Sequence, residues 1–348
     1  MSPPQSPSPD NVIHDILFIG LGPSTLSLAI ALSEQSPPPK TVILERSPRF
    51  VWSPSTLPTP RAPMRTSLLH DLTTPRNPHS QYTFLNYLVA TDSLVAYTNL
   101  GAINPPRALF ARYLAWVAKA FEEREWVRYG ADARAVEPVK VGGAVDHWRV
   151  RLADGAPVLT RKVVVAVGAA PQMPASLSGL QSSRVLHTSA YGAALPRILA
   201  QNGRVDVAIV GGGEEALEVY NHLRGMGVEG RVVLFHAEKV LRGEDANPYV
   251  RNLVAADDPV VPYELRNAGA TAGGEMASAH TITALYEDHY AQHISAANPA
   301  THDFQIRASR RVMRAEVAGE QVRLHLADPA TGLREAACFD FVIVAGFV

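Results

Sequence analysis

Two glycine-rich turns constrain the fold of this chain more than any other feature of its sequence. The first, GLGPS at residues 20–24, directly follows a short apolar run at 15–19, and the second, GGGEEA at 211–216, follows an apolar run at 205–210. A strand that enters a glycine turn and then a helix binds one dinucleotide pyrophosphate, because the first helical amides point at the phosphates. Two such units this far apart predict two dinucleotides on one protein, which is typical of a flavin enzyme reduced by a nicotinamide.

The first turn has the neighbours that a dinucleotide site requires. A helix is expected at 23–33, and a second strand at 41–44 ends at Glu45, whose carboxylate is placed to accept ribose hydroxyls. Thr25 stands where a third glycine is usual, and a glycine pattern alone is weak evidence because structural turns of this kind are common. The combination of strand, turn, helix and acidic residue favours dinucleotide binding over a purely structural turn.

The second turn is equally well placed and indicates which nicotinamide it takes. Ala216 replaces the third glycine, which the motif permits. The strand expected at 231–235 ends at His236 and not at a carboxylate. A carboxylate at that position would repel the 2′-phosphate of NADPH. His236, Lys239 and Arg242 are able to neutralise that phosphate instead. These residues favour NADPH over NADH.

Composition excludes several classes of partner. The 348 residues are 47% hydrophobic and 19% charged. The formal net charge is -1, so the protein has no positive electrostatic field that would attract nucleic acid. No run reaches the roughly 18 to 20 apolar residues that a membrane span requires. The single cysteine, Cys338, excludes an internal disulfide and the two-cysteine centre of flavin disulfide reductases. The proline-rich start lacks the features of a signal peptide. We expect a cytoplasmic protein, and a homo-oligomer is left open.

The spacing of the motifs predicts an α/β fold with two Rossmann-like domains and a small helical insertion. We expect a disordered tail at 1–12, a first dinucleotide-binding domain at 13–195, a second at 203–245, a helical substrate insertion at 246–300, and strands at 301–348 that return the chain to these domains, the first lobe in particular. Further helices are expected at 81–89, 106–123 and 281–292, and strands at 127–129, 147–152, 162–167, 312–317, 321–326 and 339–344.

Other motifs offer little catalytic chemistry. His289 and His293 lie four residues apart with Asp288 beside them, which is a metal-ligand spacing, but an exposed polar helix face explains the pattern better and no metal is expected. His187 either shapes a site or packs at the surface, and the sequence does not decide between the two. No nucleophile elbow occurs, and Cys338 lies in an apolar strand pattern, so no catalytic nucleophile is expected.

The order of motifs resembles the flavin-dependent N-hydroxylating monooxygenases, the L-ornithine and L-lysine N-monooxygenases of siderophore biosynthesis. The resemblance covers nearly the whole chain and is most specific before residue 225. The segments that carry it are residues 15–24, 44–46, 50–52, 64–72, 75–78, 82–88, 106–113, 165–168, 185–191 and the second glycine turn.

The resemblance implies FAD on the first domain, NADPH on the second, and hydroxylation of a primary amine by O₂ through a flavin hydroperoxide. The protein then contributes positioning and dryness, and no side chain is expected to be catalytic. The residues expected to bind FAD are Gly20, Gly22, Pro23, Ser24, Glu45, Arg46, Trp52, Ser53, Met64 and Arg65. Those expected to bind NADPH are Gly211, Gly212, Gly213, Glu214, Glu215, His236 and Arg242.

Departures from the family pattern fall where substrate is held. His70 stands where the ornithine enzymes have a lysine that binds the substrate carboxylate, and Arg251 and Gly269 stand where they have asparagines. Such changes alter which head groups can be paired in a buried site, so we expect a small amine or amino acid other than ornithine. The candidate substrate residues are His70, Arg251, Asn252 and Gly269.

A further departure concerns the end of the chain. The family continues past the strand at 339–344 with a segment that covers the flavin, and we expect that segment to be absent here. The alternative to an active enzyme is therefore a catalytically impaired flavin-binding relic or an assembly subunit of the same fold.

Overall fold

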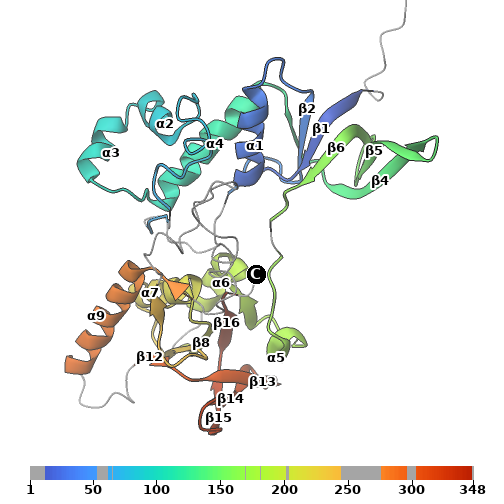
Figure 1. The fold of residues 1–348 in the computed structure, drawn as a ribbon. Coiled ribbons are helices and arrows are strands. Elements are labelled where there is room, and N and C mark those ends of the chain that lie inside the picture. The colour runs from blue at the N-terminus through green and yellow to red at the C-terminus, as the bar shows by residue number, and fades with distance from the viewer. Residues whose placement is uncertain are drawn as a thin grey trace, which may run out of the picture. The chain divides into compact units, whose positions relative to one another are not determined.

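A computed structural model describes residues 12–52, 62–64, 66–168, 170–180, 182–200, 204–243, 276–295 and 303–346 (Figure 1). These residues form two compact units, one up to residue 168 and the other from residue 170 onward.

The first unit is built on a six-stranded sheet with the order β3-β2-β1-β6-β5-β4. The strands are β1 (Ile13–Ile19), β2 (Thr41–Glu45), β3 (Val127–Tyr129), β4 (Ala133–Val141), β5 (Ala144–Leu152) and β6 (Val158–Val165). β1 pairs in parallel with both β2 and β6, so Phe18 lies between Ile43 and Val164. The hairpin of β4 and β5 extends the sheet in antiparallel fashion. The turn after β1 therefore starts from a central parallel strand.

Helices bury one face of this sheet. They are α1 (Pro23–Ser33), α2 (Phe84–Ala90), α3 (Leu94–Leu100) and α4 (Arg107–Glu123). In α4 the fully buried Tyr113, Leu114, Val117 and Phe121 recur at helical spacing, which is why this segment forms an amphipathic helix against the core. The opposite face is covered by the antiparallel extension, where Val150 joins the same core cluster as strand residues of β1 and β2.

The second unit is built on a five-stranded parallel sheet with the order β12-β9-β8-β16-β7. Its strands are β7 (Val185–His187), β8 (Val207–Val210), β9 (Val232–Phe235), β12 (Phe304–Arg307) and β16 (Phe341–Val344). β8, β9 and β16 are buried at every position. Such apolar runs are typical of parallel strands that are covered on both faces.

Different layers cover those two faces. Helices α6 (Thr188–Leu199), α7 (Glu214–Gly225) and α9 (Ala279–Ser295) pack on one face through the core cluster of Tyr191, Leu217 and Leu285. An antiparallel sheet of β13 (Arg311–Ala318), β14 (Gln321–Ala327) and β15 (Arg334–Phe339) packs on the other. The remaining elements are α5 (Ala175–Ser178) and the short parallel pair β10 (Arg242–Gly243) and β11 (Met276–Ala277).

The α/β class with two Rossmann-like lobes is confirmed, while the boundaries differ from those expected. The units divide near residue 169 rather than between 195 and 203, because β7 pairs with β16 in the second sheet. Of the described strands after residue 301, none pairs with the first sheet: β12 and β16 join the second one. No helix in the described ranges is both long and apolar enough to cross a membrane.

Candidate dinucleotide-binding sites

The first glycine turn requires glycine at position 20. Gly20 has φ +97, and a Cβ added there would lie 2.6 Å from the carbonyl oxygen of Ala166, which follows β6. A side chain would thus be strained in its backbone and would also clash with the neighbouring strand. The Thr25 hydroxyl donates to the Gly20 carbonyl at 2.8 Å and is fully buried. Thr25, at the position of the third motif glycine, therefore closes the turn rather than weakening it.

The start of α1 is open to an anion. Gly22 is the N-cap, with φ -117 and no side-chain hydrogen bond to the helix, and Pro23 follows at the first helical position. A Cβ added at Gly22 would meet no atom of the described residues within 4 Å, so the space beside it is open there. Pro23 has no amide hydrogen, so the amides of Ser24 and Thr25 are the first that α1 offers as donors to an anion. This arrangement fits a pyrophosphate.

Glu45 is fixed beside the same turn. Its two carboxylate oxygens accept hydrogen bonds from the amides of Leu21, at 2.9 Å, and Ser47, at 2.8 Å. A carboxylate has about four acceptor positions, so capacity remains for ribose hydroxyls. Arg46 is exposed. The structure thus brings Gly20, Gly22 and Glu45 together at the ends of β1 and β2, as predicted.

Two further expected FAD residues, Trp52 and Met64, lie beyond β2 in the described part of the chain. Trp52 and Met64 pack against the aromatic core of the first unit, and the ring centroid of Trp52 lies 5.7 Å from that of Phe110. The Met64 amide donates to the carbonyl of Pro105 at 2.8 Å, which fixes its backbone ahead of α4. Two further predicted residues, Ser53 and Arg65, lie outside the described residues.

His70 lies on a rigid loop. The neighbouring Asp71 carboxylate accepts hydrogen bonds from the amides of Thr73 (2.9 Å), Thr74 (2.6 Å) and Phe84 (2.6 Å), so the loop is tied to the start of α2. His70 itself is half-buried. Its backbone is therefore well placed to hold a side chain in a fixed position. The other predicted substrate residues lie outside the described residues: Arg251, Asn252 and Gly269.

The second glycine turn repeats the construction of the first. Gly211 has φ +141, and an added Cβ would lie 2.7 Å from the carbonyl oxygen of Ala345, which follows β16. Gly213 is the N-cap of α7 and makes no side-chain hydrogen bond to the helix. In both units the first glycine thus faces the carbonyl that follows an adjacent parallel strand. The contacts of Ala166 and Ala345 with these glycines were not predicted from the sequence, although a Val-Ala pair at the end of each strand was the available signal.

The two acidic residues of the second turn bind other helices. Glu214 is only 9% exposed, and its carboxylate accepts hydrogen bonds from Ser278 and Thr281 at the start of α9. Glu215 accepts a hydrogen bond from the Thr188 hydroxyl at 2.7 Å, at the start of α6. Their side chains are therefore engaged within the protein, which leaves the backbone amides of the turn as its donors to a nucleotide.

The residues expected near a 2′-phosphate differ in accessibility. His236 is 3% exposed, burial lowers its pKa, and its Nδ1 has no partner among the described residues. A buried, neutral imidazole is a poor counter-charge for a phosphate. Arg242 and Lys239 are exposed, and Arg242 lies 3.4 Å from Glu238. Of His236 and Arg242, the two residues expected to bind NADPH beyond β9, Arg242 is therefore better placed to reach a phosphate.

Two other expectations concern histidines. His187, which the sequence left open, is the N-cap of α6, where its Nδ1 accepts a hydrogen bond from the Ser189 amide at 3.0 Å. On α9, Asp288 forms an ion pair with Arg224 at 3.1 Å. Within the described ranges, no three His, Cys, Asp or Glu side chains are grouped so as to hold a metal.

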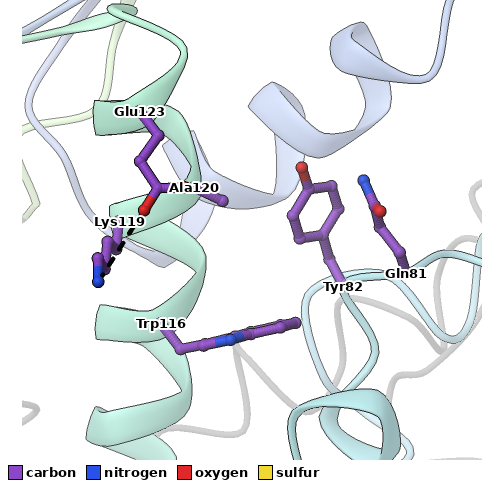
Figure 2. Close-up of a pocket in the computed structure, with 6 residues that line it drawn as sticks. All are labelled: Gln81, Tyr82, Trp116, Lys119, Ala120 and Glu123. Carbon is purple, nitrogen blue, oxygen red and sulfur yellow. Dashed lines mark ion pairs between the residues drawn. The ribbon is translucent and has the colours of Figure 1, made fainter. Parts of the chain in front are cut away.

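One cavity, of about 330 Å³, lies in the first unit away from the predicted residues. Figure 2 shows the Trp116 indole reaching from α4 toward Tyr82 on the loop before α2. The lining residues are Gln81, Tyr82, Trp116, Lys119, Ala120 and Glu123. Lys119 and Glu123 form an exposed ion pair at 3.9 Å, and no described side chain there is a buried unpaired charge. The glycine turns remain the candidate sites.

This chain is similar to characterised proteins over nearly its whole length. The sequence model of a family described as L-lysine 6-monooxygenase/L-ornithine 5-monooxygenase matches residues 12–347. An L-ornithine N(5)-monooxygenase of Ajellomyces capsulatus is 31% identical over 353 residues, which cover 95% of this chain and 74% of that protein. The solved ornithine hydroxylase PvdA from Pseudomonas aeruginosa has a TM-score of 0.85 at 29% identity, covering 97% of this chain and 83% of that one. The ornithine N-hydroxylase of Kutzneria sp. 744, solved with reduced FAD, NADP⁺ and L-ornithine, has a TM-score of 0.82 at 24% identity, covers 96% of this chain and 80% of its own, and shows the shared fold.

Proposed function

Since the chain belongs to the L-lysine 6-monooxygenase/L-ornithine 5-monooxygenase family, we propose that it is an FAD- and NADPH-dependent N-monooxygenase that hydroxylates the primary amine of a small amine or amino acid. The reaction consumes one amine, one O₂, one NADPH and one proton, and yields one hydroxylamine, one water and one NADP⁺. The observation that carries this proposal is the pair of glycine turns. In each, an added Cβ would clash with a carbonyl oxygen, at 2.6 or 2.7 Å, and the following helix has no side-chain cap.

FAD binds to the first unit in this proposal. The amides that open α1 receive the pyrophosphate, and Glu45, held by two backbone amides, accepts the ribose hydroxyls. Trp52 and Met64 pack on the core beside this site and exclude water. Bound FAD supplies the activation of O₂ once NADPH has reduced it, and the protein contributes binding, orientation and a dry site.

NADPH binds to the second unit. The amides that open α7 after Gly213 receive its pyrophosphate, as in the first unit. Arg242 is the candidate for the 2′-phosphate, because it is exposed while His236 is buried with a lowered pKa. The absence of a carboxylate directly after β9 supports NADPH over NADH.

The substrate class follows from the family, while the individual substrate stays a prediction. The relatives are named for L-ornithine or L-lysine, so the amine is small and primary. His70 lies on the loop that the hydrogen bonds of Asp71 tie to α2. At this position the family resemblance places a lysine that binds the carboxylate of ornithine. Replacing the point charge of an ammonium group by an imidazole changes which head groups the site can pair. Ornithine nevertheless belongs in the test panel.

The test is a panel of primary amines assayed with purified, FAD-loaded protein. L-ornithine, L-lysine, their diamine analogues and shorter amines are each mixed with NADPH or NADH, and hydroxylamine product is measured together with coenzyme oxidation. The proposal expects a yellow protein that forms hydroxylamine from at least one amine and prefers NADPH. A protein that stays colourless when loaded with FAD, or a yellow protein that oxidises NADPH but forms only peroxide with every amine, contradicts the proposal and favours the impaired relic or assembly subunit.

A further inference from the structure

The first turn of α7 carries two carboxylates where the proposed function places an anionic dinucleotide. Glu214 and Glu215 are the first two residues of the helix, directly after the N-cap Gly213. Acidic residues at a helix N-terminus are favourable for the helix itself. They also oppose a second anion at the same amides, since two like charges in a poorly solvated site repel each other. The positions of the two side chains decide which effect dominates.

The Glu214 carboxylate is held at the start of a different helix. It accepts hydrogen bonds from the Ser278 amide at 2.5 Å, the Ser278 hydroxyl at 3.1 Å and the Thr281 hydroxyl at 2.6 Å. Ser278 directly precedes α9, and its hydroxyl also accepts a hydrogen bond from the Thr281 amide at 3.2 Å. Glu214 therefore completes the N-terminal cap of α9 from outside that helix, in a place where only 9% of its surface is exposed.

Helices α7 and α9 run side by side in the same direction. Their first turns are joined by Glu214, and about ten residues further on Arg224 of α7 forms an ion pair with Asp288 of α9 at 3.1 Å. Leu285 of α9 is buried in the same core cluster as α7 residues. Parallel neighbours bring two partially positive N-termini together. The Glu214 carboxylate lies between those two ends and offsets their repulsion.

Glu215 has a similar arrangement on the other side. Its carboxylate accepts a hydrogen bond from the hydroxyl of Thr188, the first residue of α6, at 2.7 Å. The starts of α6, α7 and α9 are thus linked through the two acidic residues of one turn. Each charge is directed to a helix start other than that of α7, so that the amides of α7 stay available to an anion.

We propose that Glu214 is a positioning residue for the nicotinamide dinucleotide, because its buried carboxylate ties the start of α9 to the turn that receives the pyrophosphate. This inference rests on the proposed binding of NADPH to the second unit. The inference predicts the direction in which NADPH affinity changes when the charge of Glu214 is removed. If Glu214 acts by position, the loss weakens NADPH binding because the turn loses its support. If its charge faces the phosphates, the loss strengthens NADPH binding.

The test is a double-mutant cycle on the FAD-loaded protein. Glu214→Gln removes the charge, Thr281→Val removes one of its donors with little change in shape, and the double variant combines them. Glu287→Gln on the exposed side of α9 is the matched control for the loss of a carboxylate. The measured quantities are the dissociation constant of NADPH, the rate of flavin reduction at saturating NADPH, and the FAD content.

The expected result is selective for NADPH affinity. Glu214→Gln raises the dissociation constant about tenfold, which is about 1.4 kcal/mol, Thr281→Val about threefold, and the double variant about tenfold rather than thirtyfold. FAD content and the saturated reduction rate stay within twofold, and Glu287→Gln matches the wild type. Unchanged or tighter binding in Glu214→Gln overturns the inference, as does strict additivity, and Thr281→Val alone decides if Glu214→Gln does not fold. A wild-type protein that does not bind NADPH refutes the proposed function instead.

Discussion

Replacing Gly22 by serine should stabilise the protein and weaken FAD binding at the same time. Gly22 has φ -117 and ψ -176, which any residue adopts, and an added Cβ meets no atom within 4 Å in the part of the chain that the structure describes. Serine caps a helix better than glycine by a few tenths of a kcal/mol. Replacing glycine also reduces the conformational entropy of the unfolded chain, which stabilises the folded protein by about 0.4 to 1 kcal/mol. The sum, about 1 kcal/mol, raises the melting temperature of the first unit in the FAD-free protein by about 2 to 4 °C.

The same serine should weaken FAD binding, because it occupies the space and the amide that the pyrophosphate would use. Its Cβ projects into the space that the structure leaves open at the start of α1, and its hydroxyl competes for an amide that would bind phosphate. A lost hydrogen bond to a charged group is worth about 1.5 to 3 kcal/mol, so FAD affinity should fall about 10- to 100-fold. The opposite signs of the two effects distinguish a nucleotide site from a structural turn.

The assay combines thermal unfolding of FAD-free protein with a titration of FAD followed by flavin fluorescence. Gly179→Ser is the matched control: Gly179 has φ -85, an added Cβ meets nothing within 4 Å, and the residue lies in the second unit after α5. It should leave FAD affinity unchanged. If Gly22→Ser binds FAD as tightly as the wild type does, the first turn does not receive the pyrophosphate and the reasoning from its geometry fails.

Three further predictions follow from the described contacts. Gly211→Ala, with its Cβ 2.7 Å from the Ala345 carbonyl oxygen and φ +141, should cost about 1 to 3 kcal/mol and abolish NADPH binding while the protein stays yellow; a variant that binds NADPH normally contradicts the second site. His70→Ala should raise the KM of the amine with both cofactor affinities unchanged, and His70→Lys should shift the preference in the amine panel toward L-ornithine; an unchanged KM in His70→Ala would mean that His70 only packs against its loop. Burial lowers the pKa of His222 and of His236, so these side chains bind protons less readily in the folded protein than in the unfolded chain. Their contribution to the free energy of unfolding is therefore complete above the ordinary histidine pKa of about 6.5 and is lost as the pH falls below it. His222→Gln should make the fall in melting temperature between about pH 7.5 and pH 5 shallower, and an unchanged slope would argue against that contribution.

Elements bounded by glycine or proline could be predicted from the sequence. The expected helix at 23–33 matches α1, which begins at Pro23, and the expected strand at 127–129 matches β3, which ends before Gly130. The sequence of α6 does not predict a helix, because it contains a glycine and Pro196, which have low helix propensity. It forms one because Tyr191 and Ile198 are fully buried against the second sheet. Its stability comes from tertiary packing that no local pattern reports.

The boundary between the two units could not be derived from local patterns either. The expectation placed residues up to 195 in the first domain, yet β7 pairs with β16, which lies more than 150 residues later in the chain. Likewise β15, with the sequence REAACF, has no regular alternation and becomes a strand by pairing with β14. The pairing of β7 with β16 depends on the whole second sheet, so the order of motifs predicts the two lobes but not the strand that separates them.

The two glycine turns have the same backbone geometry but carry different charges. In both, the first glycine faces the carbonyl that follows an adjacent parallel strand, at Ala166 or at Ala345, and the helix amides stay without a side-chain cap. In the first unit the nearby acid, Glu45, is held by backbone amides of the turn region and keeps acceptor positions for ribose. In the second unit the acids lie within the helix itself, where they would oppose a phosphate unless other helix starts engage them. The hydroxyls of Thr188, Ser278 and Thr281 do so, and the second site therefore depends on helices α6 and α9 in a way that the first does not.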